Sequence, residues 1–167
     1  MKALIIALML ATAPLTMAPM EVSTPAVLYD WPSGEESQIL RPYAPPEVRW
    51  GAGHRGVDLE LPAGDHVVAA GDGVVAFAGM VAGRPVISID HADGIRTTYE
   101  PVAPSVSRDE QVAVGQIIGT LLAGHEPHGG LHWGARIGAD YIDPLSLLAS
   151  RTVRLYPLEA PVRTTGG

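Results

Sequence analysis

Short apolar or alternating runs, separated by turn residues, fill the middle of this chain. Their length and their content of Val, Ile, Thr and Tyr are typical of half-buried strands. The predicted strands are His66–Ala70, Val74–Ala78, Arg84–His91, Ile95–Pro101, Gln111–Val114, Gln116–Leu121 and, as the last, Leu131–Ile137. We therefore predict an all-β, antiparallel fold with a sandwich-like core of short hairpins and long loops.

Turn chemistry suggests how these runs connect. Gly71-Asp72-Gly73 is the kind of turn that joins paired strands, so it predicts a hairpin between the first two runs. Ala92-Asp93-Gly94 predicts a second turn, and Gly115 separates the fifth run from the sixth. One short C-terminal helical turn is predicted, with Asp143 as N-cap and Pro144 in the first helical position.

The flanks differ from this middle part, which gives four expected regions. Residues 1–20 combine Lys2 with an apolar run and small residues, a pattern typical of a signal peptide. A retained membrane anchor is the alternative. Pro14 argues against it, because it interrupts an apolar run that is already short for a membrane span. Residues 21–49 form a proline-rich extended lead-in with one short strand around Gln38–Leu40, residues 50–150 the folded domain, and residues 151–167 a tail. The expected location is secreted or in the cell envelope, outside the cytoplasmic membrane.

Composition narrows the classes of partner. The formal net charge is −7 and no basic stretch occurs along the 167 residues, which argues against nucleic acid as a partner. Glycine (19) and proline (15) are plentiful, in keeping with many turns. Cysteine is absent, so disulfides and thiolate metal ligands are excluded.

His54 and Asp58 are the first candidates for metal chemistry. On a regular strand, positions i and i+4 share a face but lie roughly 13 Å apart, whereas zinc ligands converge to about 2 Å from one ion. The segment must therefore bend if both bind metal, and Gly53 and Gly56 are where a bend costs least. This spacing alone does not identify a metal site.

The surrounding motifs carry a more specific resemblance over roughly residues 31–148. They are Gly53–Leu59, Gly64, His66–Val75, Asp93–Tyr99, Val112–Gly119, Leu131-His132 and Asp143-Pro144. In this order they resemble the LytM/lysostaphin family of zinc peptidoglycan endopeptidases. The resemblance implies that His54, Asp58 and His132 bind one Zn²⁺ and leave its fourth position to water, as in hydrolytic zinc sites.

Two positions depart from the family pattern. The first histidine of its His-x-His motif, expected to act as general base, falls at Gly130, and the histidine of Tyr-x-His falls at Pro101. Groups of this kind contribute about 10²–10⁴-fold in rate. His125 and His128, in the loop before His132, are candidate replacements, with an exposed polar loop as the alternative. Glu100 adjoins the lost histidine but is expected to point away from the face of Tyr99 and Pro101.

Other positions are candidates for substrate binding. Tyr99 and Trp133 could line a groove for glycan or stem peptide, with core packing as the alternative. Arg55 and Arg136 flank the ligand segments and could meet a peptide carboxylate, with plain surface charge as the alternative. His66 and His91 are expected to have no part in the site.

Two functional hypotheses remain. One is a zinc metallopeptidase that cuts peptidoglycan cross-link peptides. The other is a catalytically impaired module that binds the cell wall or regulates another cell-wall hydrolase. A lipoyl or biotinyl carrier, which the Val-Ala-Ala-Gly-Asp-Gly segment resembles, is excluded because the only lysine is Lys2.

Overall fold

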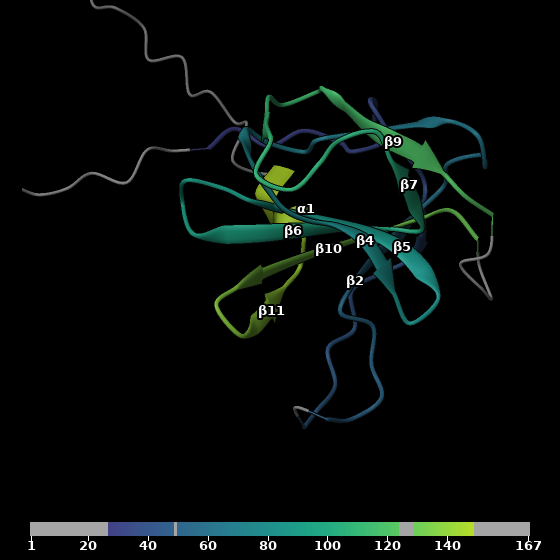
Figure 1. The fold of residues 1–167 in the computed structure, drawn as a ribbon. Helices are drawn as coiled ribbons and strands as arrows, with labels where there is room; N and C mark the ends of the chain where they lie inside the picture. The colour runs from purple at the N-terminus through teal and green to yellow at the C-terminus, as the bar shows by residue number, and fades with distance from the viewer. Residues whose placement is uncertain (1–26, 49, 124–128, 149–167) are drawn as a thin grey trace, which may run out of the picture.

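The computed structural model describes residues 27–48, 50–123 and 129–148, and this part of the chain is almost entirely β-structure (Figure 1). The strands are β1 (Ile39–Arg41), β2 (Gly56–Leu59), β3 (His66–Val68), β4 (Gly73–Val81), β5 (Arg84–Asp90), β6 (Ile95–Glu100), β7 (Val102–Pro104), β8 (Gln111–Val112), β9 (Ile117–Leu121), β10 (Leu131–Ile137) and β11 (Asp140–Ile142), and one helix, α1 (Leu145–Leu148), follows them. The predicted all-β, antiparallel class is confirmed.

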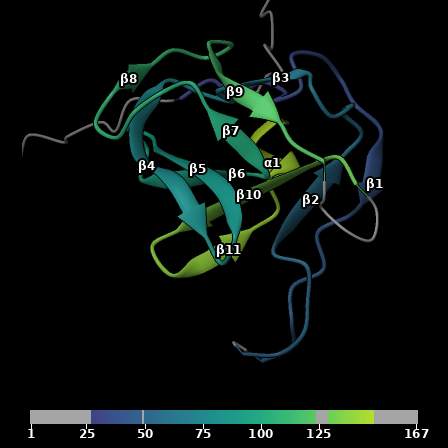
Figure 2. The same cartoon turned by 45° about the vertical axis from the view of Figure 1, so that its right-hand side comes forward.

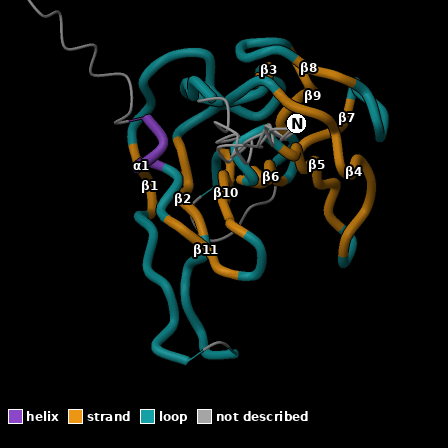
Figure 3. The backbone as a smooth tube through the Cα atoms, turned by 90° about the vertical axis from the view of Figure 1, so that its left-hand side faces the viewer, coloured by secondary structure: helices purple, strands orange, loops and turns teal. Residues whose placement is uncertain are grey.

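The strands form two antiparallel sheets. The larger sheet has the order β1-β2-β10-β6-β5-β4-β8, with β11 also paired to β10. The smaller sheet, β3-β9-β7, lies across one side of it (Figures 1 and 2). The connection from β1 to β2 extends away from the body of the molecule (Figure 3).

Strand β10 illustrates how alternation separates the two faces of the larger sheet. Leu131, Trp133 and Ala135 are buried in the hydrophobic core. His132 and Arg136, on the alternate positions, therefore point to the opposite face. The core is completed by inward-facing residues of both sheets, such as Val57, Val67, Ile87, Tyr99 and Ile118.

The predicted hairpin around Gly71-Asp72-Gly73 is wrong. Strand β3 pairs with β9 in the smaller sheet, whereas β4 pairs with β5 and β8 in the larger one. The turn therefore carries the chain from one sheet to the other. The sequence could not distinguish the two cases, because Val67 and Val75 are both fully buried, and apolar residues of this kind are expected in paired strands and in strands of facing sheets alike.

Other strand predictions need smaller corrections. Leu131–Ile137 is not the last strand, since β11 follows and pairs with it. The strands β2 and β7 were not predicted, and the short strand expected at Gln38–Leu40 is β1, one residue further along.

A chain of buried hydrogen bonds crosses the core beside β6. The Ala70 amide donates to the Tyr99 hydroxyl (3.0 Å), and Tyr99 and Thr97 share a hydrogen bond of 2.8 Å. His91 Nε2 lies 2.8 Å from Thr97 Oγ1, and Nδ1 donates to the Asp72 carbonyl (2.8 Å). Because a carbonyl only accepts, Nδ1 carries the proton and Nε2 of the neutral ring accepts from Thr97.

Burial sets the protonation of this network. It lowers the pKa of His91 and raises the pKa of Tyr99 to about 12.

The Tyr29 ring meets the His91 ring edge-on at 5.0 Å, and its hydroxyl donates to the Asp93 carboxylate. The segment that precedes β1 is therefore fastened to the core of the domain.

The C-terminal helix begins as expected. Asp143 Oδ1 accepts a hydrogen bond from the Leu145 amide (3.0 Å), so Asp143 caps α1. In the described part of the chain, the helical segments are too short to cross a bilayer. The predicted signal peptide (1–20) and tail (151–167) lie outside the described residues.

Candidate metal centre

The chain bends at Arg55, between His54 and the start of β2. His54 is held before the bend by an isolated bridge to Ala44, and Asp58 lies within β2. The bend brings His54 Nε2 to 2.9 Å from Asp58 Oδ1, although the residues are four apart. It occurs between Gly53 and Gly56, where the sequence predicted that bending would cost least.

His132 reaches the same point from β10. The register pairs it directly with Asp58 of β2. His132 Nδ1 lies 2.8 Å from Asp58 Oδ1 and 3.1 Å from His54 Nε2. His54 and Asp58 are buried, with 4% and 1% of their surface exposed, and the His132 side chain retains 18%. The three residues can offer one ligand atom each around a common point.

The tautomer of His54 suits a metal ligand. Its Nδ1 lies 2.8 Å from the Pro42 carbonyl oxygen, which only accepts, so Nδ1 carries the proton. A neutral His54 then presents the Nε2 lone pair to a carboxylate oxygen at 2.9 Å. A cation between these atoms would stabilise that arrangement. A backbone carbonyl that orients a histidine in this way is the usual support of a zinc ligand.

The separations also fit zinc. Tetrahedral bonds of about 2.0–2.2 Å place ligand atoms about 3.3–3.6 Å apart, so the three distances of 2.8–3.1 Å need to lengthen by only a few tenths of an ångström. The donor set of two imidazoles and one carboxylate matches that of hydrolytic zinc sites. These residues therefore fit a zinc ion.

Gly56 leaves room for the His132 ring. A Cβ at this position would overlap the Trp133 carbonyl oxygen and lie 2.8 Å from His132 Cε1. Real Cβ atoms do not approach other atoms so closely, so a side chain here would displace the ligand.

Glu100 is a residue of this face that the sequence argument set aside. It pairs with His132 in the register of β6 and β10. Its carboxylate receives a 2.8 Å ion pair from Arg84 Nε and is 16% exposed. The sequence correctly placed it opposite Tyr99. Tyr99 is a core residue, so its neighbour Glu100 points to the opposite face of the sheet, which is also the face of the ligands. Recognising Tyr99 as core would have revealed this from the sequence.

The two positions that depart from the family pattern cannot transfer protons. Pro101 is buried, and Gly130 has a φ of 78°, a left-handed conformation that favours glycine. A Cβ at Gly130 would overlap the Leu59 carbonyl oxygen. The candidate replacements His125 and His128 lie outside the described residues.

The remaining candidates are not members of the group formed by His54, Asp58 and His132. Tyr99 and Trp133 have no exposed surface and belong to the core, which agrees with the packing alternative. Arg55 lies at the bend, with its guanidinium 5.8 Å from the centre of the Tyr141 ring. His91 is part of the buried network, and His66 is exposed on β3 in the smaller sheet.

Residues 52–144 match the family model described as Peptidase family M23. An uncharacterised protein of Mycobacterium tuberculosis is 43% identical over 141 residues, which cover 80% of this chain and 57% of that protein. The DD-carboxypeptidase/endopeptidase Mpg of Neisseria meningitidis is 32% identical, over 56% of this chain and 22% of its own. The murein hydrolase activator NlpD of Escherichia coli is 27% identical, over 77% and 33%. The chain thus spans little more than half the length of the mycobacterial relative and less of the others.

Solved structures agree with this match. The catalytic domain of the antimicrobial peptidase lysostaphin from Staphylococcus simulans superposes with a TM-score of 0.60 and 25% identity, covering 68% of this chain and 92% of that domain. A zinc-containing peptidase from Vibrio cholerae superposes with a TM-score of 0.54 and 24% identity, covering 64% and 35%. The second likeness concerns the fold alone.

Proposed function

The chain belongs to peptidase family M23, and from this membership we propose that it is a zinc peptidase that cleaves cross-link peptides of peptidoglycan outside the cytoplasmic membrane. The name of the Neisseria relative, a carboxypeptidase and endopeptidase, and that of the peptidase lysostaphin support the peptidase activity. The name of the murein hydrolase activator NlpD supports the wall polymer, and that of the lipoprotein YgeR of Escherichia coli supports the location.

The convergence of His54 Nε2, Asp58 Oδ1 and His132 Nδ1 is the observation that carries the proposal. A zinc ion held by these three atoms would polarise a peptide carbonyl and activate a water molecule. Asp58 would supply the negative charge that offsets the cation. The Pro42 carbonyl accepts a hydrogen bond from His54 Nδ1, which leaves the Nε2 lone pair available to a metal ion.

A peptidase also needs a group that accepts and returns a proton. Among the described residues we propose Glu100 for this role, because it pairs with His132 in the register of β6 and β10 and its side chain is mostly buried. Arg84 Nε holds its carboxylate. The sequence-based candidates His125 and His128 remain alternative proton acceptors.

A second candidate function is a module that binds the wall or regulates another hydrolase. The backbone at Gly130 favours it, since a histidine there has no room, and so does the similarity to NlpD, a murein hydrolase activator. The buried ligand set favours the peptidase, because a pure binding module has no chemical need of an open zinc position.

The test measures bound zinc and the release of soluble peptides from peptidoglycan in the full chain and in His132→Ala. We expect about one zinc per chain, product release, and loss of both in the variant. His66→Ala is the matched control, since His66 is exposed in the other sheet. Zinc without cleavage of varied wall preparations would favour the binding module. A chain that binds no zinc would contradict both the peptidase and its site.

A further inference from the structure

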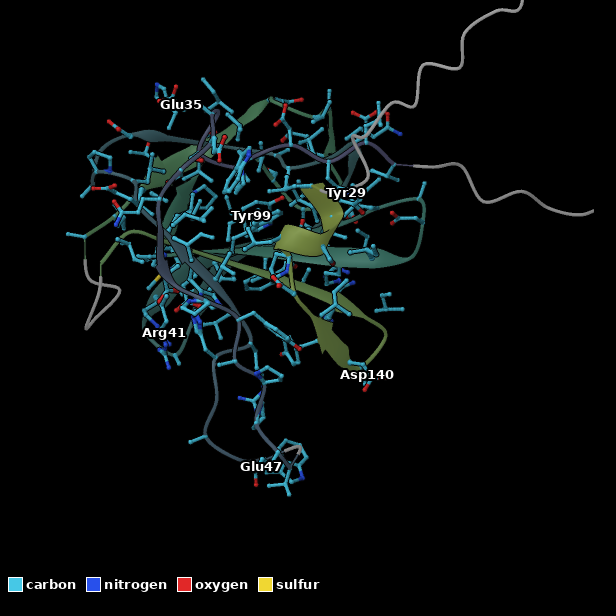
Figure 4. All side chains as sticks on the ribbon, turned by 180° about the vertical axis from the view of Figure 1, so that it is seen from behind. Tyr29, Glu35, Arg41, Glu47, Tyr99 and Asp140 are labelled. Carbon is cyan, nitrogen blue, oxygen red and sulfur yellow. The ribbon has the colours of Figure 1, made fainter. Side chains whose placement is uncertain are left out.

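A pocket lies on the ligand face of the larger sheet, at the end where β11 joins β10. It is a pocket of about 690 Å³ between the β1–β2 loop and the β10–β11 hairpin. Figure 4 labels Glu47 at the end of that loop and Asp140 in the hairpin. The residues that define its chemistry are Tyr43, Trp50, Arg55, Arg136, Asp140 and Tyr141. Its volume is in the range of sites for small ligands.

Internal contacts hold the walls of this pocket in place. The Arg55 guanidinium lies 5.8 Å from the centre of the Tyr141 ring and donates to the Gly51 carbonyl (3.2 Å). The Tyr43 hydroxyl donates to the Tyr141 carbonyl (2.8 Å). The loop and the hairpin are therefore tied to one another, and the pocket is formed before a ligand arrives.

The charge of the pocket opposes that of the whole chain. Two arginines and one aspartate line it, whereas the chain has a formal net charge of −7. A guanidinium presents paired donors that match a carboxylate. The Trp50 side chain, 89% exposed, and Tyr141, 47% exposed, offer apolar surface next to these donors. The pocket suits an anionic group attached to an apolar or ring-shaped body.

The position of the pocket relates it to the metal ligands. Arg55 follows His54 directly, and Arg136 lies four residues beyond His132 on the same face of β10. At about 3.3 Å per residue this places Arg136 roughly 13 Å from His132. An extended peptide of about four residues covers that distance.

We propose that this pocket binds the free carboxylate end of a peptide whose chain runs to the metal ligands, with Arg55 and Arg136 as the carboxylate contacts. The inference rests on the proposed function, and it assigns a specificity for peptides that end in a free acid a few residues from the cleaved bond.

The test uses N-acetyl-tetraalanine as the free acid and as its C-terminal amide, each in the L and D forms, with the full chain. Binding is followed by tryptophan emission, and Trp50→Phe should remove the signal because Trp133 is fully buried and Trp31 packs against the core outside the pocket. We expect the acid to bind about tenfold more tightly than the amide. Arg55→Gln and Arg136→Gln should each abolish that preference. Arg108→Gln is the matched control, an arginine that is 74% exposed and outside the pocket.

Equal affinity for acid and amide, or an unchanged preference in Arg136→Gln, would overturn the inference. Thermal unfolding shows whether Arg55→Gln disrupts the loop. If it does, the acid preference of Arg136→Gln alone decides whether the pocket binds the carboxylate. A chain that prefers the acid but releases no wall peptide contradicts the proposed function and supports the pocket. A chain that releases wall peptides without preferring the acid contradicts the pocket alone.

Discussion

Glu100 lies directly opposite His132 in the antiparallel pairing of β6 and β10. Asp58 pairs with His132 from the other side, so the three residues form one row across three neighbouring strands. Directly opposed residues have Cβ atoms about 4.5–5.5 Å apart. The Glu100 Cβ therefore lies beside that of His132, while its carboxylate pairs with Arg84 of β5, on the other side of β6.

Replacing Glu100 with Gln should separate metal binding from catalysis. We expect zinc content to stay unchanged, because Glu100 is not among the three ligands, and hydrolysis to fall about 10²–10⁴-fold, because Gln accepts no proton. Metal analysis and the rate of peptide release from peptidoglycan measure the two effects.

Glu36→Gln is the control for that variant, since Glu36 is exposed and lies outside the ligand face. Full activity in Glu100→Gln would contradict the role of Glu100 and transfer it to His125 or His128.

Gly56→Ala should weaken the metal centre through packing alone. The new methyl group would meet the His132 ring and the Trp133 carbonyl, so we expect lower zinc affinity and a loss of about 1–3 kcal/mol in the free energy of unfolding. Gly134→Ala is the matched control on β10, because its nearest atoms lie 3.6–3.8 Å away at ordinary contact distance. Equal effects of the two substitutions, measured by zinc titration and urea unfolding, would show that the Gly56 contact is unimportant.

Gly130→His should not restore a family-type base. The left-handed φ and the overlap with the Leu59 carbonyl oppose any side chain there, so we expect destabilisation and no gain in hydrolysis. Gly129→Ala provides the comparison, since its φ of 71° is strained but its Cβ would meet no atom within 4 Å. A Gly130→His chain that is stable and more active would refute this account.

Acidification should destabilise the fold through His91. Burial lowers its pKa in the folded state below the ordinary value of 6.5, so the unfolded chain binds the proton more readily. The stabilisation is complete above about pH 6.5 and is lost as the pH falls below it. Protonation of Nε2 would also remove the acceptor of the Thr97 hydroxyl.

Urea unfolding from pH 8 to pH 5, compared between the unsubstituted chain and His91→Asn, measures this effect. The variant should be less stable at pH 8 and should lose less stability on acidification. Charged neighbours of His91 are Asp72, Asp90 and Asp93, which favour its protonated form and oppose the effect of burial. Parallel pH profiles for the two chains would rule out His91 as the origin.

The sequence predicted the residues of the candidate metal centre better than its surroundings. The family resemblance implied His54, Asp58 and His132 as ligands, and the structure brings these three side chains together. Alternation placed Glu100 and Tyr99 on opposite faces of the sheet, but it did not say which of the two faces carries the ligands. To decide this, Tyr99 had to be recognised as a core residue, and in the structure it has no exposed surface.

Strand partners were the part that the sequence left open. The segments flanking Gly71–Gly73 both carry buried valines, and this pattern is the same whether the strands pair together or lie in opposite sheets. Sheet membership depends on contacts between distant segments, such as β3 with β9, which no local signal near the turn reports.

The hydrogen bond from His54 to Pro42 has a consequence for where the working unit starts. The family match begins at residue 52, yet Pro42 precedes it, as does strand β1, which pairs with β2. A chain shortened to the matched region would keep all three ligands but lose the carbonyl that orients one of them. It would also expose β2 as a bare sheet edge, open to pairing with other molecules. The segment needed for an intact candidate site is therefore longer than the family match, and shortened versions should begin before Tyr29.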